Sequence, residues 1–227
     1  MVAAKLRTFL CTPNKTLLAL PPVAGTLTRG LTHFVRILAH VLAPQSLALC
    51  IWRNMKHREI KKAHEKAVLT SFNEFMNGSV GPTKLDWNPN DPPDAFGTIN
   101  QQKAWAEISD AYINSDWAKS ITSYAAEDKE HIPYSGGVMV NPDRRAGEIV
   151  KEIILKKYNK DSIHKVFLEH GPGILIVGAY TPLTFPEEII DESGEEILAS
   201  LCDLPRLFSS IYLYRNFENG HLFYKLL

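Results

Sequence analysis

The chain has 227 residues, 45% of them hydrophobic and 22% charged, which are the proportions of an ordinary soluble globular protein. Its 25 basic and 25 acidic residues balance, but residues 1–58 carry eight Lys and Arg and no acid. The rest of the chain holds 17 basic and 25 acidic residues, and this net charge of −8 argues against a nucleic-acid-binding module. The cysteines Cys11, Cys50 and Cys202 form neither a disulfide framework nor a Cys-x-x-Cys zinc pattern.

Residues 1–54 are predicted to form a basic leader. Its apolar runs at 17–27 and 30–52 are interrupted by prolines, histidines and an arginine, so neither has the ~20 nearly uninterrupted apolar residues of a spanning helix. An acid-free basic start is typical of organellar transit segments, whereas a short apolar run behind a basic tip is typical of a secretory signal. A membrane-associating amphipathic leader is favoured over a disordered tail, and both interpretations stay open.

Residues 55–84 are predicted to be a helix and a linker. Met55–Met76 has a helical pattern, with Ile60, Ala63, Ala67 and Phe75 on one face. Its basic cluster at 56–62 suits phosphates or lipid headgroups, although a cluster interspersed with glutamates is more typical of a solvated helix face. His64-Glu65 lacks the second histidine four residues on that a zinc-protease helix needs. The segment 78–97, which is rich in proline, is predicted to be an extended linker.

A helix is predicted over residues 99–124, beginning near Gln101. Its apolar residues recur at helical spacing: Trp105, Ile108, Tyr112, Trp117 and Ile121. A second helix is predicted after Asn141-Pro142-Asp143, where an N-cap, a proline at the first position and an early acid coincide. Its expected buried stripe is Ala146, Ile149, Val150, Ile153 and Ile154.

The C-terminal third is predicted to alternate between a helix and strands. A helix at 161–170 ends at Gly171-Pro172, and the apolar run Ile174–Tyr180 that follows is predicted to be a buried strand. A short apolar run at 138–140 is a further candidate strand. Residues 211–214 and 221–224 flank a turn and have a hairpin pattern. Because helices come first and strands later, the predicted fold class is α+β.

Four short segments occur in an order that resembles a known family. They are LDW at 85–87, NQQKAWAEISDAY at 100–112, DSIHKVFLEHGPGILIVGAY at 161–180 and ENGHLFYKL at 218–226. This order is similar to that of the papain-like cysteine peptidases, in which a central helix beginning at the nucleophile packs on a later antiparallel sheet. The resemblance implies a truncated papain-like domain over residues 85–227.

The resemblance also assigns site residues. It matches Gln101 to the oxyanion-hole donor, Ala104 to the nucleophile, and His221 to the general base. Trp105 matches the tryptophan that follows the nucleophile and is the implied substrate-binding residue. A cysteine at a helix N-terminus is acidified by the helix dipole and by a nearby imidazolium, but Ala104 has only a methyl group there. Read without the family, Trp105 is a core residue and His221 a surface residue of a hairpin.

The implied function is that of a papain-like homologue with peptidase activity lost or nearly so. It keeps at most a cleft for a peptide or a protease inhibitor, and it uses no metal and no cofactor. The resemblance implies a secretory or vacuolar–lysosomal location, whereas the leader favours an organelle. The alternative is a small organellar or membrane-associated interaction subunit with no catalytic site, in which the leader is the working part.

Overall fold

The computed structural model describes residues 56–90, 92–126, 128–134, 136, 141–181, 184–217 and 220–227. The chain divides into two units, 1–41 and 42–227, and all of the described residues belong to the second. The predictions for the leader and for the strand at 138–140 therefore lie outside the described residues. Among the described helices, none is long and apolar enough to cross a membrane.

Within the described residues, six strands form one mixed sheet, in which strand order follows chain order. The strands are β1 (Thr83–Trp87), β2 (Ala95–Ile99), β3 (Gln102–Tyr112), β4 (Gly173–Tyr180), β5 (Phe208–Phe217) and β6 (Gly220–Lys225). The central strands β3, β4 and β5 are parallel, and the outer pairs are antiparallel. The α+β class is confirmed, but the expectation of an antiparallel sheet is wrong.

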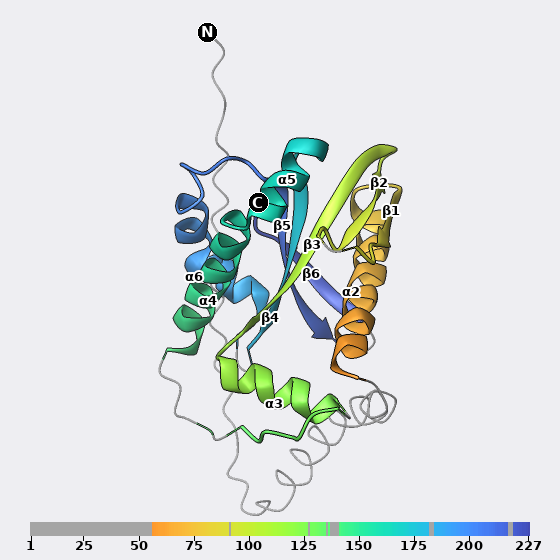
Figure 1. Cartoon of the computed structure of the whole chain (residues 1–227). Helices are drawn as coiled ribbons and strands as arrows, with labels where there is room; N and C mark the ends of the chain where they lie inside the picture. Colours follow the sequence, from red (N-terminus) through yellow and green to blue (C-terminus); the bar gives the residue numbers. More distant parts are fainter. Residues whose placement is uncertain are drawn as a thin grey trace, which may run out of the picture. The chain divides into compact units, whose positions relative to one another are not determined.

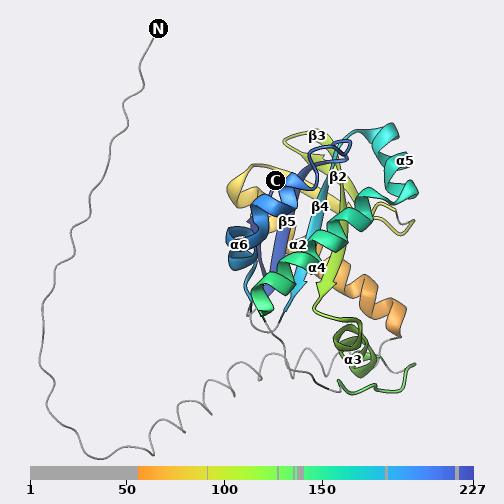
Figure 2. The same ribbon diagram turned by 90° about the vertical axis from the view of Figure 1, so that its left-hand side faces the viewer.

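Helices cover both faces of this sheet (Figure 1). They are α2 (His57–Ser79), α3 (Ser115–Ala125), α4 (Pro142–Tyr158), α5 (Asp161–His170) and α6 (Pro186–Ala199). The helix α2 lies against one face, and α4 and α6 lie against the other, as the turned view in Figure 2 also shows. Each face has its own buried apolar cluster, so the central strands are covered on both sides.

The predicted helix at 99–124 is wrong in its first half, because residues 102–112 form the strand β3. A central strand is buried on both faces and so lacks the apolar–polar alternation by which an edge strand is recognised. Asn100 and Gln101 both have positive φ, 48° and 67°, and connect β2 to β3 by a tight hairpin turn. The helix begins only at Ser115, where Asn114 Oδ1 accepts the Trp117 N–H at 2.7 Å.

The predicted linker at 78–97 is also wrong, because it contains β1 and the start of β2. The expected domain boundary between residues 84 and 85 falls inside β1. The helix α2 ends close to the predicted point, but its buried stripe differs from the expected one. The buried residues of α2 are Ile60, Glu65, Val68, Leu69, Phe72 and Met76. Because the polar residue Glu65 lies on the buried side of α2, the apolar pattern does not mark the buried face of this helix.

Several predicted elements are confirmed. The helix α4 begins at Pro142 and buries four of the five predicted residues, Ala146, Ile149, Val150 and Ile154, whereas Ile153 is only half-buried. The helix α5 spans the predicted residues, β4 begins one residue before the predicted strand, and β5 and β6 form the predicted hairpin. The helix α6 was not predicted; its buried residues include a serine and a glycine, which weaken the apolar stripe.

Candidate functional site

The residues that the papain-like resemblance assigned do not form one site. Gln101 is exposed in the β2–β3 turn, and Ala104 lies in β3, so the expected helix N-terminus is absent at this position. His221 lies on β6, three strands away and near the opposite end of the sheet. By strand geometry, Ala104 and His221 are about 14 Å apart across the sheet and about 26 Å apart along it. A thiol at residue 104 would therefore not reach His221.

Trp105 is a core residue. Its side chain is buried, its Nε1 donates to the carbonyl of Gly171 at 2.9 Å, and its ring lies 5.6 Å from that of Phe208. Gly173 passes so close that a β-carbon there would collide with the indole ring. The interpretation of Trp105 as core is therefore confirmed.

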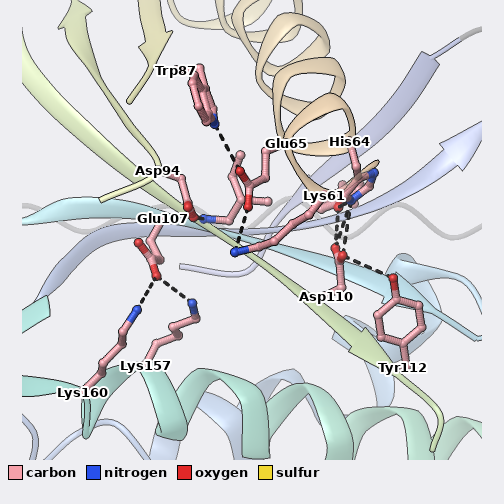
Figure 3. A network of polar contacts seen from close by, with 12 residues as sticks. Lys61, His64, Glu65, Trp87, Asp94, Glu107, Asp110, Tyr112, Lys157 and Lys160 are labelled. Atoms are coloured by element: carbon pink, nitrogen blue, oxygen red, sulfur yellow. Dashed lines mark hydrogen bonds and ion pairs between the residues drawn. The ribbon is translucent and has the colours of Figure 1, made fainter. Parts of the chain in front are cut away.

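A different set of polar side chains meets at the carboxyl ends of the three parallel strands. Figure 3 shows three of its members, His64, Asp110 and Tyr112. Asp110 comes from β3, Tyr180 from β4 and Tyr214 from β5, all on the face that α2 covers. His64 reaches them from α2. Since parallel strands end at the same edge of a sheet, and ligands of open α/β sheets bind there, we treat this cluster as the candidate site.

Asp110 and His64 form the centre of the cluster. His64 Nε2 lies 3.3 Å from each carboxylate oxygen of Asp110. The Tyr214 hydroxyl donates to Asp110 Oδ1 at 2.7 Å and lies 3.0 Å from His64 Nε2. The His64 and Asp110 side chains are 17% and 20% exposed, so the pair is largely desolvated but remains open to solvent.

Two further tyrosines border the pair. Tyr112 and Tyr180 are paired positions of β3 and β4, and their rings are stacked at 5.0 Å with an interplanar angle of 17°. The Tyr112 hydroxyl lies 3.4 Å from Asp110 Oδ2. The Tyr180 hydroxyl lies 3.4 Å from both His64 Nε2 and Asn216 Oδ1. All three contacts are long for hydroxyl hydrogen bonds, so the hydroxyl groups of Tyr112 and Tyr180 are held more loosely than that of Tyr214.

The cluster shifts the pKa values of its members. Burial lowers the pKa of His64, but the hydrogen bond and negative charge of Asp110, with a contribution from Glu65, outweigh it and raise the pKa above 6.5. Burial and the Asp110 charge raise the pKa values of Tyr112, Tyr180 and Tyr214, so all three hydroxyls stay protonated at neutral pH. The site therefore combines a basic imidazole, a carboxylate and phenolic donors.

His221 lies beside this cluster. Its Nδ1 is 2.9 Å from Ser71 Oγ, and its ring centroid is 5.4 Å from that of Tyr214. Burial lowers the pKa of His221 to about 4, and the nearby charge of His64 contributes to the shift. His221 is thus a neutral neighbour of the site at physiological pH, and its low basicity does not suit the role of general base that the resemblance implied.

Gly178 provides the floor of the site. A β-carbon at this position would lie 2.7 Å from Asp110 Oδ1 and equally close to the rings of Tyr180 and Tyr214. Since these three side chains converge over the β4 backbone, only a residue without a side chain leaves room for them.

Other charged groups of the network in Figure 3 are structural. Glu65 Oε2 accepts from Trp87 Nε1 at 3.1 Å, and Asp94 Oδ2 accepts from the backbone N–H of Ile108 at 2.7 Å. On the opposite face of β3, the carboxylate of Glu107 contacts the lysines of α4 and the α4–α5 turn. Its Oε1 lies 2.6 Å from Lys157 Nζ and 3.4 Å from Lys160 Nζ. These contacts fix elements to one another.

Two cavities lie away from the cluster. One, of about 590 Å³, separates α6 from β6. The other, of about 490 Å³, lies between the β2–β3 hairpin and the end of α5. It is lined by Phe96, Gly97, Thr98, Lys103, Ala104, Trp105, Glu169 and His170. We base the functional assignment on the polar cluster, because neither cavity lining has an acid–base pair with a comparably desolvated carboxylate.

In the part of the chain that the structure describes, no group of three or more His, Cys, Asp or Glu side chains is placed to hold a metal ion. Comparisons with protein-family models, with curated proteins and with solved structures found no match.

Little in the sequence indicates this site. No motif in the sequence surrounds His64, and its partners Asp110 and Tyr214 lie 46 and 150 positions away in the chain. Tyrosines at the ends of apolar runs, such as Tyr180 and Tyr214, were the available signal. They point to a common site only once β3, β4 and β5 are known to be parallel neighbours.

Proposed function

We propose that the protein is an enzyme that moves a proton to or from a small substrate bound at the carboxyl ends of β3, β4 and β5. The observation that carries this proposal is the His64–Asp110 pair, partly desolvated and bordered by three tyrosine hydroxyls. An imidazole whose orientation is fixed by a carboxylate is a common general acid or base, and it works best with a pKa near neutrality.

The geometry gives each residue a role in this proposal. Asp110 accepts from His64 Nε2 and so holds the ring in one orientation. His64 Nδ1, across the ring from Asp110, is then the nitrogen that exchanges a proton with the substrate. Tyr214 is a positioning residue, since its strong hydrogen bond fixes the carboxylate of Asp110. Gly178 leaves the space in which these groups meet.

Isotope exchange tests the proposal. The full chain is incubated in D₂O with a panel of small carbon acids (a ketone, an aldehyde, a β-keto acid and a nitroalkane), and loss of the acidic C–H signal is followed by NMR. We expect the wild-type protein to exchange at least one of them faster than His64→Gln does. His170→Gln, an exposed histidine at the far end of the sheet, is the matched control. Equal rates for all three proteins would contradict the proposal.

A second candidate function, peptide binding, rests on the cavity beside Ala104. We infer it from the lining, which offers aromatic side chains together with charges of both signs, from Lys103 and Glu169. This keeps from the papain-like resemblance only the cleft for a peptide, without peptidase chemistry. Panning a random peptide library against the full chain tests it. Binders should lose affinity to Ala104→Arg, which fills the cavity, and unchanged binding would contradict this candidate.

A further inference from the structure

We propose that the hydroxyl groups of Tyr112 and Tyr180 together bind one negatively charged oxygen of a small organic ligand, such as a phenolate or an enolate. This inference rests on the proposed function, because it names the substrate class of the same site. An enolate is what remains when a proton is removed from carbon beside a carbonyl group, and its charge lies mainly on oxygen.

The first support is the difference among the three tyrosines. The Tyr214 hydroxyl already has a strong acceptor, because it donates to Asp110 at 2.7 Å, the usual length for such a bond. The contacts of Tyr112 with Asp110 and of Tyr180 with Asn216 are both 3.4 Å. Hydroxyl groups held at this length lose little when they turn toward a better acceptor. Tyr112 and Tyr180 are therefore the two donors that a ligand can recruit.

The second support is their spacing. Tyr112 and Tyr180 are paired across parallel strands, and their rings are stacked nearly parallel, with an interplanar angle of 17° and centroids 5.0 Å apart. Their hydroxyls are then roughly one strand spacing apart, about 4.8 Å. A single oxygen that bridges them can accept from both at about 2.7 Å, a normal hydrogen-bond length. Two donors converging on one oxygen is the arrangement that stabilises a developing oxyanion.

The third support is the protonation state of the two phenols. Both phenols stay protonated at neutral pH, since burial and the Asp110 carboxylate raise their pKa values, and so they act as donors. The negative charge of Asp110 is countered by His64, which a ligand oxygen would also approach. Tyr112 and Tyr180 are both half-buried, and Asn216 beside the Tyr180 hydroxyl is exposed.

The experiment uses 4-nitrophenolate as the probe, with 4-nitroanisole as a neutral probe of the same shape. Binding to the full chain is followed by the absorption of the phenolate and by NMR. We expect the wild type to bind the phenolate and not the anisole. Tyr112→Phe and Tyr180→Phe should each weaken binding about tenfold or more, because each removes one hydrogen bond to a charged acceptor. Each variant removes a single oxygen atom, and its fold is checked by circular dichroism.

The matched control is Tyr224→Phe, which removes a hydroxyl from β6, where Tyr224 pairs with Leu213 and both side chains face away from α2. Its affinity should equal that of the wild type. Equal loss in all three variants, no loss in the first two, or equal binding of anisole would each overturn the inference. Carbon–hydrogen exchange that depends on His64 but occurs without phenolate binding would overturn only this inference. Phenolate binding without any exchange would instead count against the proposed proton transfer.

Discussion

Asn73 on α2 makes both hydrogen bonds that a neighbouring strand would make to Leu85 on β1. Its Oδ1 accepts the Leu85 N–H at 2.9 Å, and its Nδ2 donates to the Leu85 carbonyl at 2.8 Å. Asn77 does the same for Thr83. Residues four apart in a helix rise about 6 Å, which matches two residues of a strand, about 6.6 Å. The edge of the sheet is therefore closed by helix side chains instead of by another strand.

We expect Asn73→Ala to lower the free energy of unfolding by about 1–3 kcal/mol, because it leaves two buried backbone groups of Leu85 without partners. Urea unfolding measures the loss, and faster hydrogen exchange of the Leu85 amide locates it. The neighbouring exposed residue supplies the control, since Glu74→Ala should change the free energy of unfolding by less than about 0.5 kcal/mol. If Asn73→Ala is as stable as Glu74→Ala, the edge is not closed in this way.

The His64–Asp110 pair should make stability depend on pH. The pKa of His64 is raised in the folded state, so the folded protein holds this proton more tightly than the unfolded chain does. Its stabilising effect is complete below pH ~6.5 and is lost as pH rises through the folded-state value. Burial lowers this value, and Asp110 and Glu65 raise it by more.

The measurement is an NMR titration of the His64 ring together with urea unfolding at several pH values. Asp110→Asn removes the charge and should lower the His64 pKa. It should also flatten the loss of stability above pH ~6.5. A His64 pKa that is unchanged in Asp110→Asn would show that the pair is not electrostatically coupled.

His221 should act in the opposite sense. Its folded-state pKa is about 4, below that of an unfolded histidine, because burial and the charge of His64 disfavour the imidazolium. The unfolded chain therefore binds the proton more readily, and stability falls as pH drops from about 6.5 toward 4. His221→Gln, which does not titrate, should lose less stability over this window than the wild type or His170→Gln. Identical slopes in the three proteins would contradict the assignment.

Gly178→Ala should disturb the site more than the fold. Its methyl group would lie 2.7 Å from Asp110 Oδ1 and from two tyrosine rings, and such overpacking costs about 1–3 kcal/mol. Because Asp110 must move, we expect the His64 pKa to fall. In Gly194→Ala, the new methyl group meets no atom closer than 3.5 Å, and this helix position should tolerate or favour alanine. An unchanged His64 pKa in Gly178→Ala would show that Asp110 does not depend on this space.

Lys157 and Lys160 both contact Glu107, but they should differ in effect. Glu107 is 1% exposed, Lys157 lies 2.6 Å away and is mostly buried, and Lys160 is 41% exposed at 3.4 Å. Lys157→Met leaves a buried carboxylate poorly compensated and should cost about 3–5 kcal/mol. Lys160→Met should cost less than about 1 kcal/mol, as for an exposed pair. Urea unfolding compares the two, and equal costs would mean that Lys160 can replace its neighbour.

Local signals in the sequence predicted one part of the fold well. Asn141-Pro142 marked the start of α4, Gly171 marked the end of α5, and alternation marked the last hairpin. The first three strands were missed. Asn100-Gln101 forms the turn between β2 and β3 without the glycine that usually marks such turns. In addition, β3 is buried on both faces and so lacks a strand's alternation. Long-range pairing hid the site itself, because no local pattern joins His64 to Asp110.

The pairing of Tyr112 with Tyr180 spans 68 positions of the chain, whereas β2 joins β3 through a two-residue turn, and Phe217 of β5 pairs with Gly220 of β6. Closing so long a loop is costly in chain entropy and slow, so the local hairpins should form first and the parallel centre afterwards. His64, Asp110 and Tyr214 belong to separate parts of that order and meet only when α2 and both hairpins have docked. A rise in the His64 pKa during refolding should therefore accompany the slowest phase and report completion of the whole fold.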